Sequence, residues 1–335
     1  MLNVAVVGMG GIGNNHAGCY KNNKAVKLVA VCDVIREKAE QAGQKWECRA
    51  FGSIKEMLEA GLDIQAVSLT TKGAENGGDH YQPTMELLRA GIAVLGEKPI
   101  SNKIPEAREM VALAKQKKIP YAINLNHRFT PAARKAKEWM RQGRLGELHL
   151  LNMTMWINNP AETSPHFHMR ALHPHSIDVM RYFGGDIHKV QAFFKKGAGR
   201  TIWSNVQMNV LFANGAVGHL TGSYDAGVGY GLETCDIVGS KGRVVIEEAC
   251  ERLVFQNRLS KETERYDYLG GMLGFGDTFQ SRLNAWVDDL IKKTPPEKID
   301  GKAEDALKAQ LVIEAAIESW DKGTVVTVPA AQRAL

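Results

Sequence analysis

The stretch Val4-Ala5-Val6-Val7-Gly8-Met9-Gly10-Gly11-Ile12-Gly13 decides the fold of the first part of the chain. Residues 4–7 form an apolar run typical of a buried parallel strand, and the glycines after it predict a sharp turn into a helix. Gly8, Gly10 and Gly13 have the G-x-G-x-x-G spacing of dinucleotide-binding turns, although glycines that only make a turn would show the same spacing. The helix start would offer unpaired N–H groups to a pyrophosphate. We expect five residues of the turn to bind it: Gly8, Gly10, Gly11, Ile12 and Gly13.

An acidic residue after the second apolar run supports a dinucleotide site. Residues 27–32 form a second strand-like run that ends in Asp33, which lies 20 residues beyond Gly13. A carboxylate there would accept hydrogen bonds from ribose hydroxyls and repel the 2′-phosphate of NADP. Arg36 is the contrary feature, because a nearby arginine can accommodate that phosphate. We therefore expect NAD as the cofactor, with NADP less favoured.

The pattern up to residue 124 alternates strands with helices. Strand-like runs at 64–70, 92–96 and 120–124 are separated by helical runs at 81–90 and 104–117. This alternation predicts an α/β Rossmann domain with a parallel sheet over residues 1–124. Ligands of such sheets bind at the carboxyl ends of the strands. We expect the remaining cofactor contacts there: Thr70, Thr71, His80, Glu97 and Lys98.

From residue 125 to residue 335 the pattern is that of an α+β substrate-binding and oligomerisation domain. Its strand-like runs are 148–157, 189–195, 205–212, 216–224, 235–239, 243–247 and 324–328, and its helical runs are 134–142, 174–183, 279–292 and 303–320. The Asn214-Gly215 pair predicts a hairpin. We expect a large, open, mainly antiparallel sheet with helices on one face. The uncovered face favours a homodimer or homotetramer formed through this sheet.

The composition excludes several function classes. An apolar fraction of 44% and a charged fraction of 24% are typical of a globular protein. A net charge of +5 without a basic cluster argues against a nucleic-acid partner. No apolar run approaches the ~20 residues that a bilayer requires, and the chain opens on a core strand rather than a signal peptide, so we expect no membrane partner and a cytoplasmic location. The cysteines form no C-x-x-C pair and are expected to be buried thiols: Cys19, Cys32, Cys48, Cys235 and Cys250.

Four segments together resemble one known family across the whole chain. They are the glycine turn followed by His16-Ala17, the tripeptide Glu97-Lys98-Pro99, Asn126-His127-Arg128-Phe129, and His175-Ser176-Ile177-Asp178. With them the chain resembles the Gfo/Idh/MocA family of glucose–fructose oxidoreductases and inositol dehydrogenases. The resemblance implies oxidation or reduction of a sugar or cyclitol carbon with NAD or NADP. It also implies that Lys98 and His175 handle the substrate proton.

Both of these residues suit acid–base chemistry. The Lys98 ammonium could hydrogen-bond the reacting hydroxyl and favour its alkoxide, the alternative being a solvated loop lysine. His175 follows Pro174, a residue favoured in the first turn of a helix, where the helix dipole would keep the imidazole neutral. A helix-capping histidine is the alternative. Asp178, three residues later, would orient the ring or raise its pKa.

The chain departs from the family at position 171. Dehydrogenases of this group commonly carry an aspartate four residues before the histidine, whereas this chain has Ala171. His173 could substitute for that carboxylate or reshape the pocket. The departure puts the family's usual proton relay, and with it the substrate, in question.

Several further polar and aromatic residues are candidates for substrate contact. H-x-H spacing on a strand would place His166 and His168 on one face, but no carboxylate or cysteine with ligand spacing accompanies them, so a sugar-binding cluster is expected rather than a metal site. Trp156 could face a sugar ring or pack in the core, and His16 is expected to pack near the cofactor. The expected substrate-binding set is Lys98, Asn126, Arg128, Trp156, His166, His173, His175 and Asp178.

The sequence therefore predicts an NAD-dependent dehydrogenase that oxidises a secondary hydroxyl of a cyclitol, sugar or sugar derivative. One alternative is a redox-neutral enzyme that retains NAD and processes a glycoside by transient oxidation, which Ala171 and the histidine cluster motivate. The other is a non-catalytic protein that senses a sugar or nucleotide.

Overall fold

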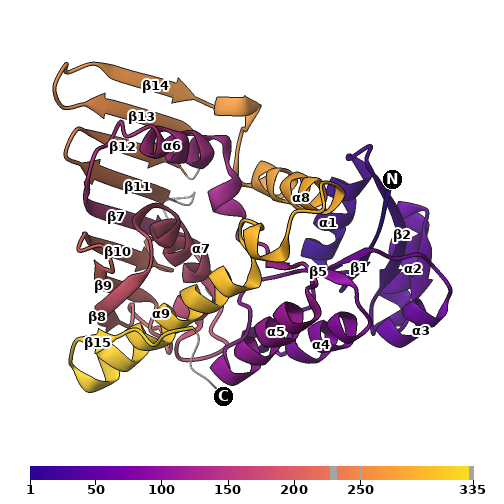
Figure 1. The fold of residues 1–335 in the computed structure, drawn as a ribbon. Helices are drawn as coiled ribbons and strands as arrows, with labels where there is room; N and C mark the ends of the chain where they lie inside the picture. Colours follow the sequence, from indigo (N-terminus) through magenta and orange to yellow (C-terminus); the bar gives the residue numbers. More distant parts are fainter. Residues whose placement is uncertain (227–231, 249–250, 332–335) are drawn as a thin grey trace. The chain divides into compact units, whose positions relative to one another are not determined.

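The computed structural model describes residues 1–226, 232–248 and 251–331 (Figure 1). The chain divides into two compact units, each described here by itself. Residues Met1–Asn124 and Phe279–Leu307 form the first unit, and residues Leu125–Thr278 and Lys308–Leu335 form the second. The division after residue 124 coincides with the expected domain boundary, but residues 279–307 belong to the first unit.

The first unit contains a six-stranded parallel sheet with the order β3-β2-β1-β4-β5-β6. Its strands are β1 (Leu2–Val7), β2 (Val26–Cys32), β3 (Arg49–Phe51), β4 (Ala66–Leu69), β5 (Ala93–Gly96) and β6 (Tyr121–Ile123). Its helices are α1 (Gly11–Lys21), α2 (Arg36–Trp46), α3 (Ile54–Glu59), α4 (Tyr81–Arg89), α5 (Ile104–Lys117) and, from Phe279 onward, α8 (Phe275–Ile291). The predicted Rossmann fold is confirmed.

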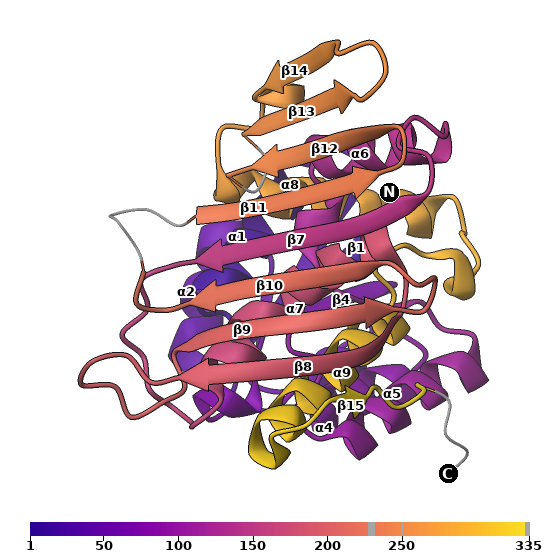
Figure 2. The same ribbon diagram turned by 90° about the vertical axis from the view of Figure 1, so that its left-hand side faces the viewer.

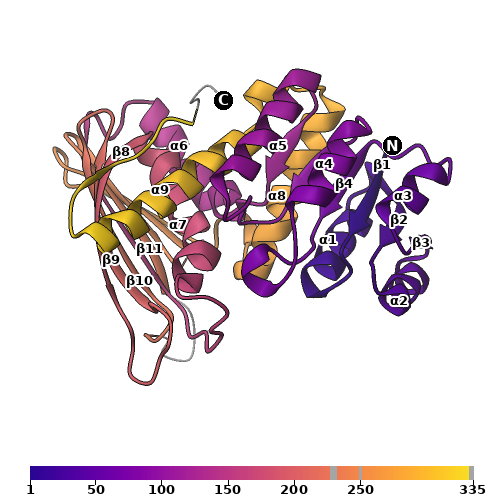
Figure 3. The same ribbon diagram turned by 90° about the horizontal axis from the view of Figure 1, so that it is seen from below.

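Helices cover the strands of this sheet and close its core. Residues of α1, α2 and α8 share one apolar cluster with β1 and β2, including Val4, Tyr20, Leu28, Ala42 and Trp286. The helices α4 and α5 pack against each other (Figure 3). The near-continuous burial of β1 and β4 explains why these strands are apolar throughout rather than alternating.

The second unit is built on a nine-stranded sheet with the order β14-β13-β12-β11-β7-β10-β9-β8-β15 (Figure 2). The strands are β7 (Leu148–Trp156), β8 (Ile187–Lys195), β9 (Asn205–Phe212), β10 (Val217–Ser223), β11 (Leu232–Gly239), β12 (Gly242–Glu247), β13 (Arg252–Asn257), β14 (Thr263–Asp267) and β15 (Val326–Thr327). Strands β7 and β10 pair in parallel, and the other described neighbours pair antiparallel. The predicted open, mainly antiparallel sheet is confirmed.

One face of this sheet is apolar and covered by helices, and the other is polar. The helices are α6 (Pro131–Arg141), α7 (Phe167–Gly184) and the later part of α9 (Ala303–Lys322). In β9, Val206, Met208 and Val210 are buried, while Gln207 and Asn209 between them are exposed. The same alternation recurs in the neighbouring strands β8 and β10, so the polar side chains lie on the face away from the helices. Figure 2 views the sheet with its strands in front of α7 and α9.

Helix α7 departs from the sequence prediction. It begins at Phe167, so Pro174 lies inside it rather than in its first turn. The predicted strand carrying His166 and His168 is also wrong, because His166 is the N-cap of α7 and His168 lies within it. The expected helix 174–183 was therefore only its second half. A proline inside a helix costs one backbone hydrogen bond, and here the burial of both sides of α7 offsets that loss.

Three of the four described cysteines are buried as expected, and Cys48 is partly exposed. Cys19, Cys32, Cys48 and Cys235 are free thiols, and burial raises the pKa of Cys19 to about 11; Cys250 lies outside the described residues. Among the helices that the structure describes, none combines the length and the hydropathy needed to cross a membrane.

Candidate active site

Two glycines of the turn between β1 and α1, Gly8 and Gly13, leave no room for a Cβ. Gly8 has φ +94°, and a Cβ on it would lie 2.6 Å from the Thr71 nitrogen. A Cβ on Gly13 would lie 2.0 Å from the Gly8 carbonyl oxygen. The Thr70 hydroxyl donates to the Val7 and Gly8 carbonyl oxygens at 3.0 and 2.7 Å. Thr70 therefore stabilises the turn from the neighbouring strand, and its hydroxyl is already engaged there.

The open side of the turn fits a pyrophosphate. A Cβ on Gly10 or Gly11 would have no neighbouring atom within 4 Å. Gly10 is the N-cap of α1, no side chain caps this helix, and its first turn carries no acidic residue. Ile12 in this turn is 42% exposed. Unpaired N–H groups and the positive end of the helix dipole thus meet at a surface without side-chain obstruction, as an anion requires.

Asp33 is held ready for a ribose. Its Oδ2 accepts from the Met9 nitrogen at 2.7 Å, and its Oδ1 accepts from the Ile35 nitrogen at 2.9 Å. Each oxygen keeps further acceptor capacity for a hydroxyl. Arg36 pairs with Glu40 at 3.2 Å on its own helix. The arginine is therefore engaged along α2, in agreement with the expected preference for NAD.

A buried hydrogen-bonded chain lies behind the Glu97-Lys98-Pro99 tripeptide. Glu97 accepts from Asn124 Nδ2 at 2.6 Å, and its Oε1 lies 3.3 Å from His16 Nε2. His16 Nδ1 lies 3.1 Å from Ser68 Oγ, which lies 2.7 Å from the Tyr20 hydroxyl. All five residues are buried. The donors form one consistent order, in which Tyr20 donates to Ser68, Ser68 to His16, and His16 through Nε2–H to Glu97.

These hydrogen bonds keep Glu97 charged beside Lys98. Burial by itself would raise the pKa of Glu97, but the hydrogen bond from His16, together with the Lys98 ammonium and the hydrogen bond from Asn124, holds it below its ordinary value. Burial lowers the pKa of Lys98, and the Glu97 carboxylate opposes that shift. Lys98 follows β5 and is joined to Pro99 by a cis peptide bond. A lysine of lowered pKa can release and retake a proton more readily than a solvated one.

His80 joins the loops after β4 and β5. Its Nδ1 lies 2.7 Å from the Pro99 carbonyl oxygen, and its Nε2 lies 3.0 Å from the Thr71 carbonyl oxygen. The Thr71 hydroxyl donates to the Asp79 carbonyl oxygen at 2.9 Å. His80 is buried, and both of its ring nitrogens face backbone. The residue therefore positions the loop that carries Lys98.

In the second unit, the segment Asn126–Phe129 packs beside α7. Arg128 Nε donates to Asp178 Oδ2 at 2.7 Å, a second guanidinium contact makes the pair bidentate, and both residues are buried. The Arg128 guanidinium also lies over the Tyr182 ring at 5.1 Å. Asn126 is fully buried and donates to Thr278. Asp178 therefore holds Arg128 in place, a role the sequence did not indicate.

His175 lies in the middle of α7, where it is 6% exposed. The expectation that a helix N-terminus keeps it neutral is therefore wrong, because the positive end of the dipole lies at residue 167. Its ring stacks on that of His127, with centroids 4.3 Å apart and planes inclined by 24°. His127 Nδ1 lies 2.9 Å from Glu233 Oε1. Sequence reasoning missed this pair, because Glu233 is separated from His127 by 106 residues.

The histidines predicted to form one cluster lie on different sides of helix α7. Residues 173 and 175 differ by about 200° around α7, so they face opposite sides. His173 and His168 meet through their Nε2 atoms at 3.0 Å, and His173 Nδ1 lies 3.0 Å from Ser176 Oγ. His166 instead contacts the edge of the Phe194 ring. In the described part of the chain, no three His, Cys, Asp or Glu residues are grouped as metal ligands would be.

Trp156 lies on the sheet face that points away from α7. Met155 beside it points toward α7, where the Ser176 hydroxyl contacts its sulfur. Trp156 instead lines a groove with Phe193, Gln207 and Thr221 on the polar face. A sugar bound beside His175 would therefore not rest on this indole.

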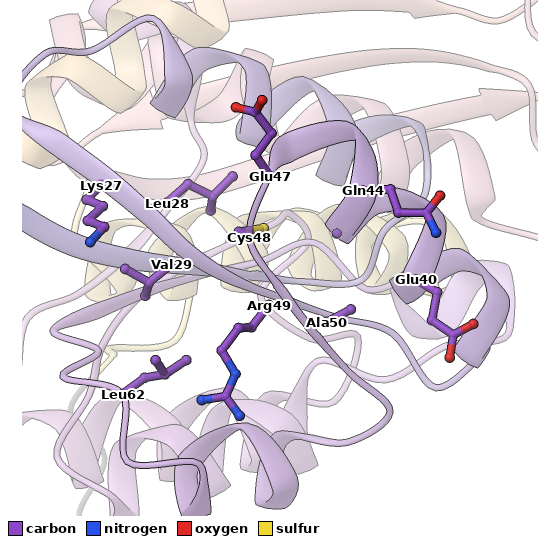
Figure 4. Close-up of a pocket in the computed structure, with 11 residues that line it drawn as sticks. Lys27, Leu28, Val29, Glu40, Gln44, Glu47, Cys48, Arg49, Ala50 and Leu62 are labelled. Atoms are coloured by element: carbon purple, nitrogen blue, oxygen red, sulfur yellow. The ribbon is translucent and has the colours of Figure 1, made fainter.

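A second groove, in the first unit, lies away from the glycine turn. It is lined by residues of α2, β2 and the β3 edge, among them Lys27, Glu40, Glu47, Cys48 and Arg49 (Figure 4). Lys27 and Arg49 stand at the amino ends of their strands, whereas Gly8, Asp33 and Thr70 follow carboxyl ends. This groove is thus at the wrong end of the sheet for the cofactor.

Comparison with known proteins identifies the class of this molecule. Residues 2–125 match the model of an oxidoreductase family with an NAD-binding Rossmann fold. Residues 133–245 match the GFO/IDH/MocA C-terminal domain. The chain is an NAD-binding oxidoreductase. It belongs to the GFO/IDH/MocA family, as the four sequence segments predict.

Relatives and solved structures agree with this assignment. The chain is 25% identical to the myo-inositol 2-dehydrogenase of Thermotoga maritima over 96% of this chain and 97% of the relative. It is 28% identical to the D-glucoside 3-dehydrogenase of Escherichia coli over 44% of this chain and 42% of the relative. A levoglucosan dehydrogenase in complex with NADH and levoglucosan shares its fold, with a TM-score of 0.86 at 20% identity over 98% of this chain and 99% of that one.

Alanine substitutions in the glycine turn separate folding from cofactor binding. We expect Gly13→Ala to lower the free energy of unfolding by about 1–3 kcal/mol, because its Cβ has no room. Gly10→Ala should leave that free energy unchanged but weaken NADH binding about tenfold, because its methyl group enters the pyrophosphate space. Urea unfolding and NADH fluorescence titration measure the two effects. Equal NADH affinity in wild type and Gly10→Ala would exclude this placement of the pyrophosphate.

Acid should destabilise the second unit through the His168–His173 pair. Burial lowers the pKa of His168 to about 3 and that of His173 well below its ordinary value. The folded state keeps both rings neutral while the unfolded chain takes up protons near pH 6.5, so stability falls as the pH drops from about 6.5 toward 3. His168 alone costs about 2 kcal/mol at pH 5.

The measurement is urea unfolding at pH 7 and pH 5 of the wild type and His168→Gln. The variant should lose less stability on acidification than the wild type. An equal loss in both would show that His168 is already protonated or exposed in the folded protein.

Proposed function

We propose that this chain is an NAD-dependent dehydrogenase that oxidises a secondary hydroxyl of a cyclitol, sugar or sugar derivative. Family membership supports the redox class and the cofactor, and relatives named inositol 2-dehydrogenase and D-glucoside 3-dehydrogenase support the substrate class. The observation that carries the proposal is the half-buried Lys98 beside the charged, hydrogen-bonded Glu97 at the carboxyl end of β5. This arrangement supplies a cation whose proton can be exchanged where a nicotinamide site is expected.

The residues of the first unit hold the cofactor. The N–H groups at the start of α1 would hold the pyrophosphate, and the Asp33 carboxylate would accept from the adenosine ribose. When bound, NAD supplies a nicotinamide ring that accepts a hydride. Neither role requires a side-chain movement, because Gly10 leaves open space and both Asp33 oxygens are fixed by backbone donors.

Lys98 and His175 have different roles at the substrate hydroxyl. The Lys98 Nζ donates a hydrogen bond to the hydroxyl oxygen and stabilises the alkoxide as it forms. An imidazole nitrogen of His175 receives the hydroxyl proton. Removing that proton as the hydride leaves avoids a cationic carbonyl product, which makes both groups necessary for a fast chemical step.

NADH formation tests this function. Wild-type protein is mixed with NAD, and with NADP in parallel, across inositols, aldoses, uronates and glycosides, and absorbance at 340 nm is followed. At least one polyol should reduce NAD, and Lys98→Met or His175→Asn should lower kcat by at least about 100-fold. Both variants should still bind NADH, because neither residue contributes to the pyrophosphate site.

Two other results would contradict the proposal. Purified protein that retains stoichiometric NAD and forms no net NADH with any compound would favour the redox-neutral alternative. Turnover that survives Lys98→Met unchanged would remove Lys98 from the chemistry.

We also propose that the polar face of the second unit's sheet pairs with a second copy of the chain. Phe193 and Val217 on this face are 55% and 52% exposed, and His219 Nδ1 lies 2.8 Å from Asn209 Oδ1 on the adjacent strand. Light scattering should give about two or four times the monomer mass of 36.9 kDa. Phe193→Asp combined with Val217→Asp should give the monomer mass with an unchanged circular dichroism spectrum. A monomeric wild type would end this proposal.

A further inference from the structure

We propose that His127 and Glu233 act as a positioning pair for His175, in the place of the carboxylate that the chain lacks at position 171. The inference rests on the proposed role of His175 as proton acceptor. Three elements meet here: the segment Asn126–Phe129, helix α7 and strand β11. Each supplies one of the three side chains.

Glu233 fixes the orientation and the tautomer of His127. The His127 Nδ1 lies 2.9 Å from Glu233 Oε1 and 2.7 Å from its Oε2. Because a carboxylate only accepts, Nδ1 carries the hydrogen. The side chains of His127 and Glu233 are 3% and 12% exposed, so solvent screens their interaction little. The His127 Nε2 is buried and has no partner among the described residues.

The face of the His127 ring lies against His175. The centroids are 4.3 Å apart and the planes nearly parallel, and the edge of Phe275 closes on His127 at 5.4 Å. An imidazole that donates its N–H to a carboxylate gains electron density, and such a ring attracts a cation placed on its face. The pair therefore favours the protonated form of His175, the form it takes when it receives the hydroxyl proton. Stacking also fixes the plane of the ring.

Two further titratable groups of this unit lie beside the three side chains, namely Asp178 on the same helix as His175 and Cys235 next to Glu233 and His127. Asp178 on α7 is held bidentately by Arg128. On strand β12, Glu247 lies opposite Thr234 and so on the other face of the sheet from Glu233, where it pairs with Arg252 at 2.6 Å. Burial raises the pKa of Cys235, which keeps that thiol neutral.

His173 does not supply the missing function either. It faces the other side of α7, and its nitrogens meet His168 and Ser176. The expectation that His173 replaces the absent aspartate is therefore not supported by its contacts. In the described part of this unit, the His127 ring lies between the Glu233 carboxylate and His175.

The test is an NMR titration of the histidine ring protons in the full-length protein without ligand. The His175 signals are assigned by their loss in His175→Asn. In Glu233→Gln, which keeps the size of the side chain and removes its charge, the titration midpoint of His175 should move to lower pH by about half a unit or more. His127→Phe keeps an aromatic face and removes the N–H, and it should also move the His175 midpoint to lower pH. This second variant tests the inference if Glu233→Gln does not fold.

A matched control and a rescue complete the design. Glu247→Gln removes a carboxylate of the same sheet that faces away from α7 and pairs with Arg252, and should leave the His175 midpoint within about 0.1 unit of wild type. Ala171→Asp in the Glu233→Gln background should restore the midpoint, because residue 171 lies one helical turn before His175.

Activity gives a second readout once a substrate is found. Glu233→Gln should lower kcat about tenfold near neutral pH and shift the acid limb of the pH profile downward, with KM for NAD unchanged. An unshifted His175 midpoint in both folded Glu233→Gln and folded His127→Phe would overturn the inference. Because the titration needs no substrate, this result can be told apart from failure of the proposed dehydrogenase activity.

Discussion

The close approach of Gly13 to the Gly8 carbonyl oxygen is the constraint on which the first unit depends. An added Cβ at residue 13 would lie 2.0 Å from that oxygen, so α1 rests directly on the end of β1. His16 stands three residues later on the same helix face. The contact that leaves no room for a side chain at position 13 thus also carries His16 inward to Ser68 and Glu97. One backbone contact therefore fixes both the glycine turn and the helix that brings His16 to Glu97.

In each unit, a hydrogen-bonded carboxylate lies behind one of the two side chains that we propose for proton transfer. In the first, the Glu97 carboxylate stands behind Lys98 and is held by Asn124 and His16. In the second, Glu233 contacts His127, and the His127 ring stacks on His175. Buried carboxylates are costly unless hydrogen-bonded, so each is fixed by donors from distant parts of the chain. The resulting rigidity is what a site for proton transfer needs, because its geometry is set before a substrate arrives.

Local patterns were sufficient to predict most of the architecture. The glycine spacing, Asp33 and the alternation of apolar runs gave the Rossmann fold, since each signal lies within a few residues of the structure that it specifies. Strands β13 and β14 were missed, because charged residues such as Arg252, Glu264 and Arg265 interrupt any apolar alternation. The start of α7 was misplaced because Pro174 favours a first turn but is tolerated inside a helix that its neighbours pack on both sides.

The sequence predicted individual site residues but not the contacts between them. Lys98, His175, Arg128 and Asp178 were each singled out, but the bidentate partnership of the last two depends on how the segment Asn126–Phe129 packs on α7. Trp156 was placed near the substrate because a strand pattern alone does not tell which face meets a given helix. Glu233 had no local signal at all. A motif names one residue of such a contact, but its partner lies far away in the sequence and is set by the fold.

A crystal structure of the protein with NADH and a polyol tests the central claim most directly, because the account requires Lys98 and His175 to serve one hydroxyl. The account predicts the Lys98 Nζ and a His175 ring nitrogen within about 3 Å of the same substrate oxygen. A bound polyol whose reacting hydroxyl is beyond hydrogen-bonding reach of either side chain would contradict it.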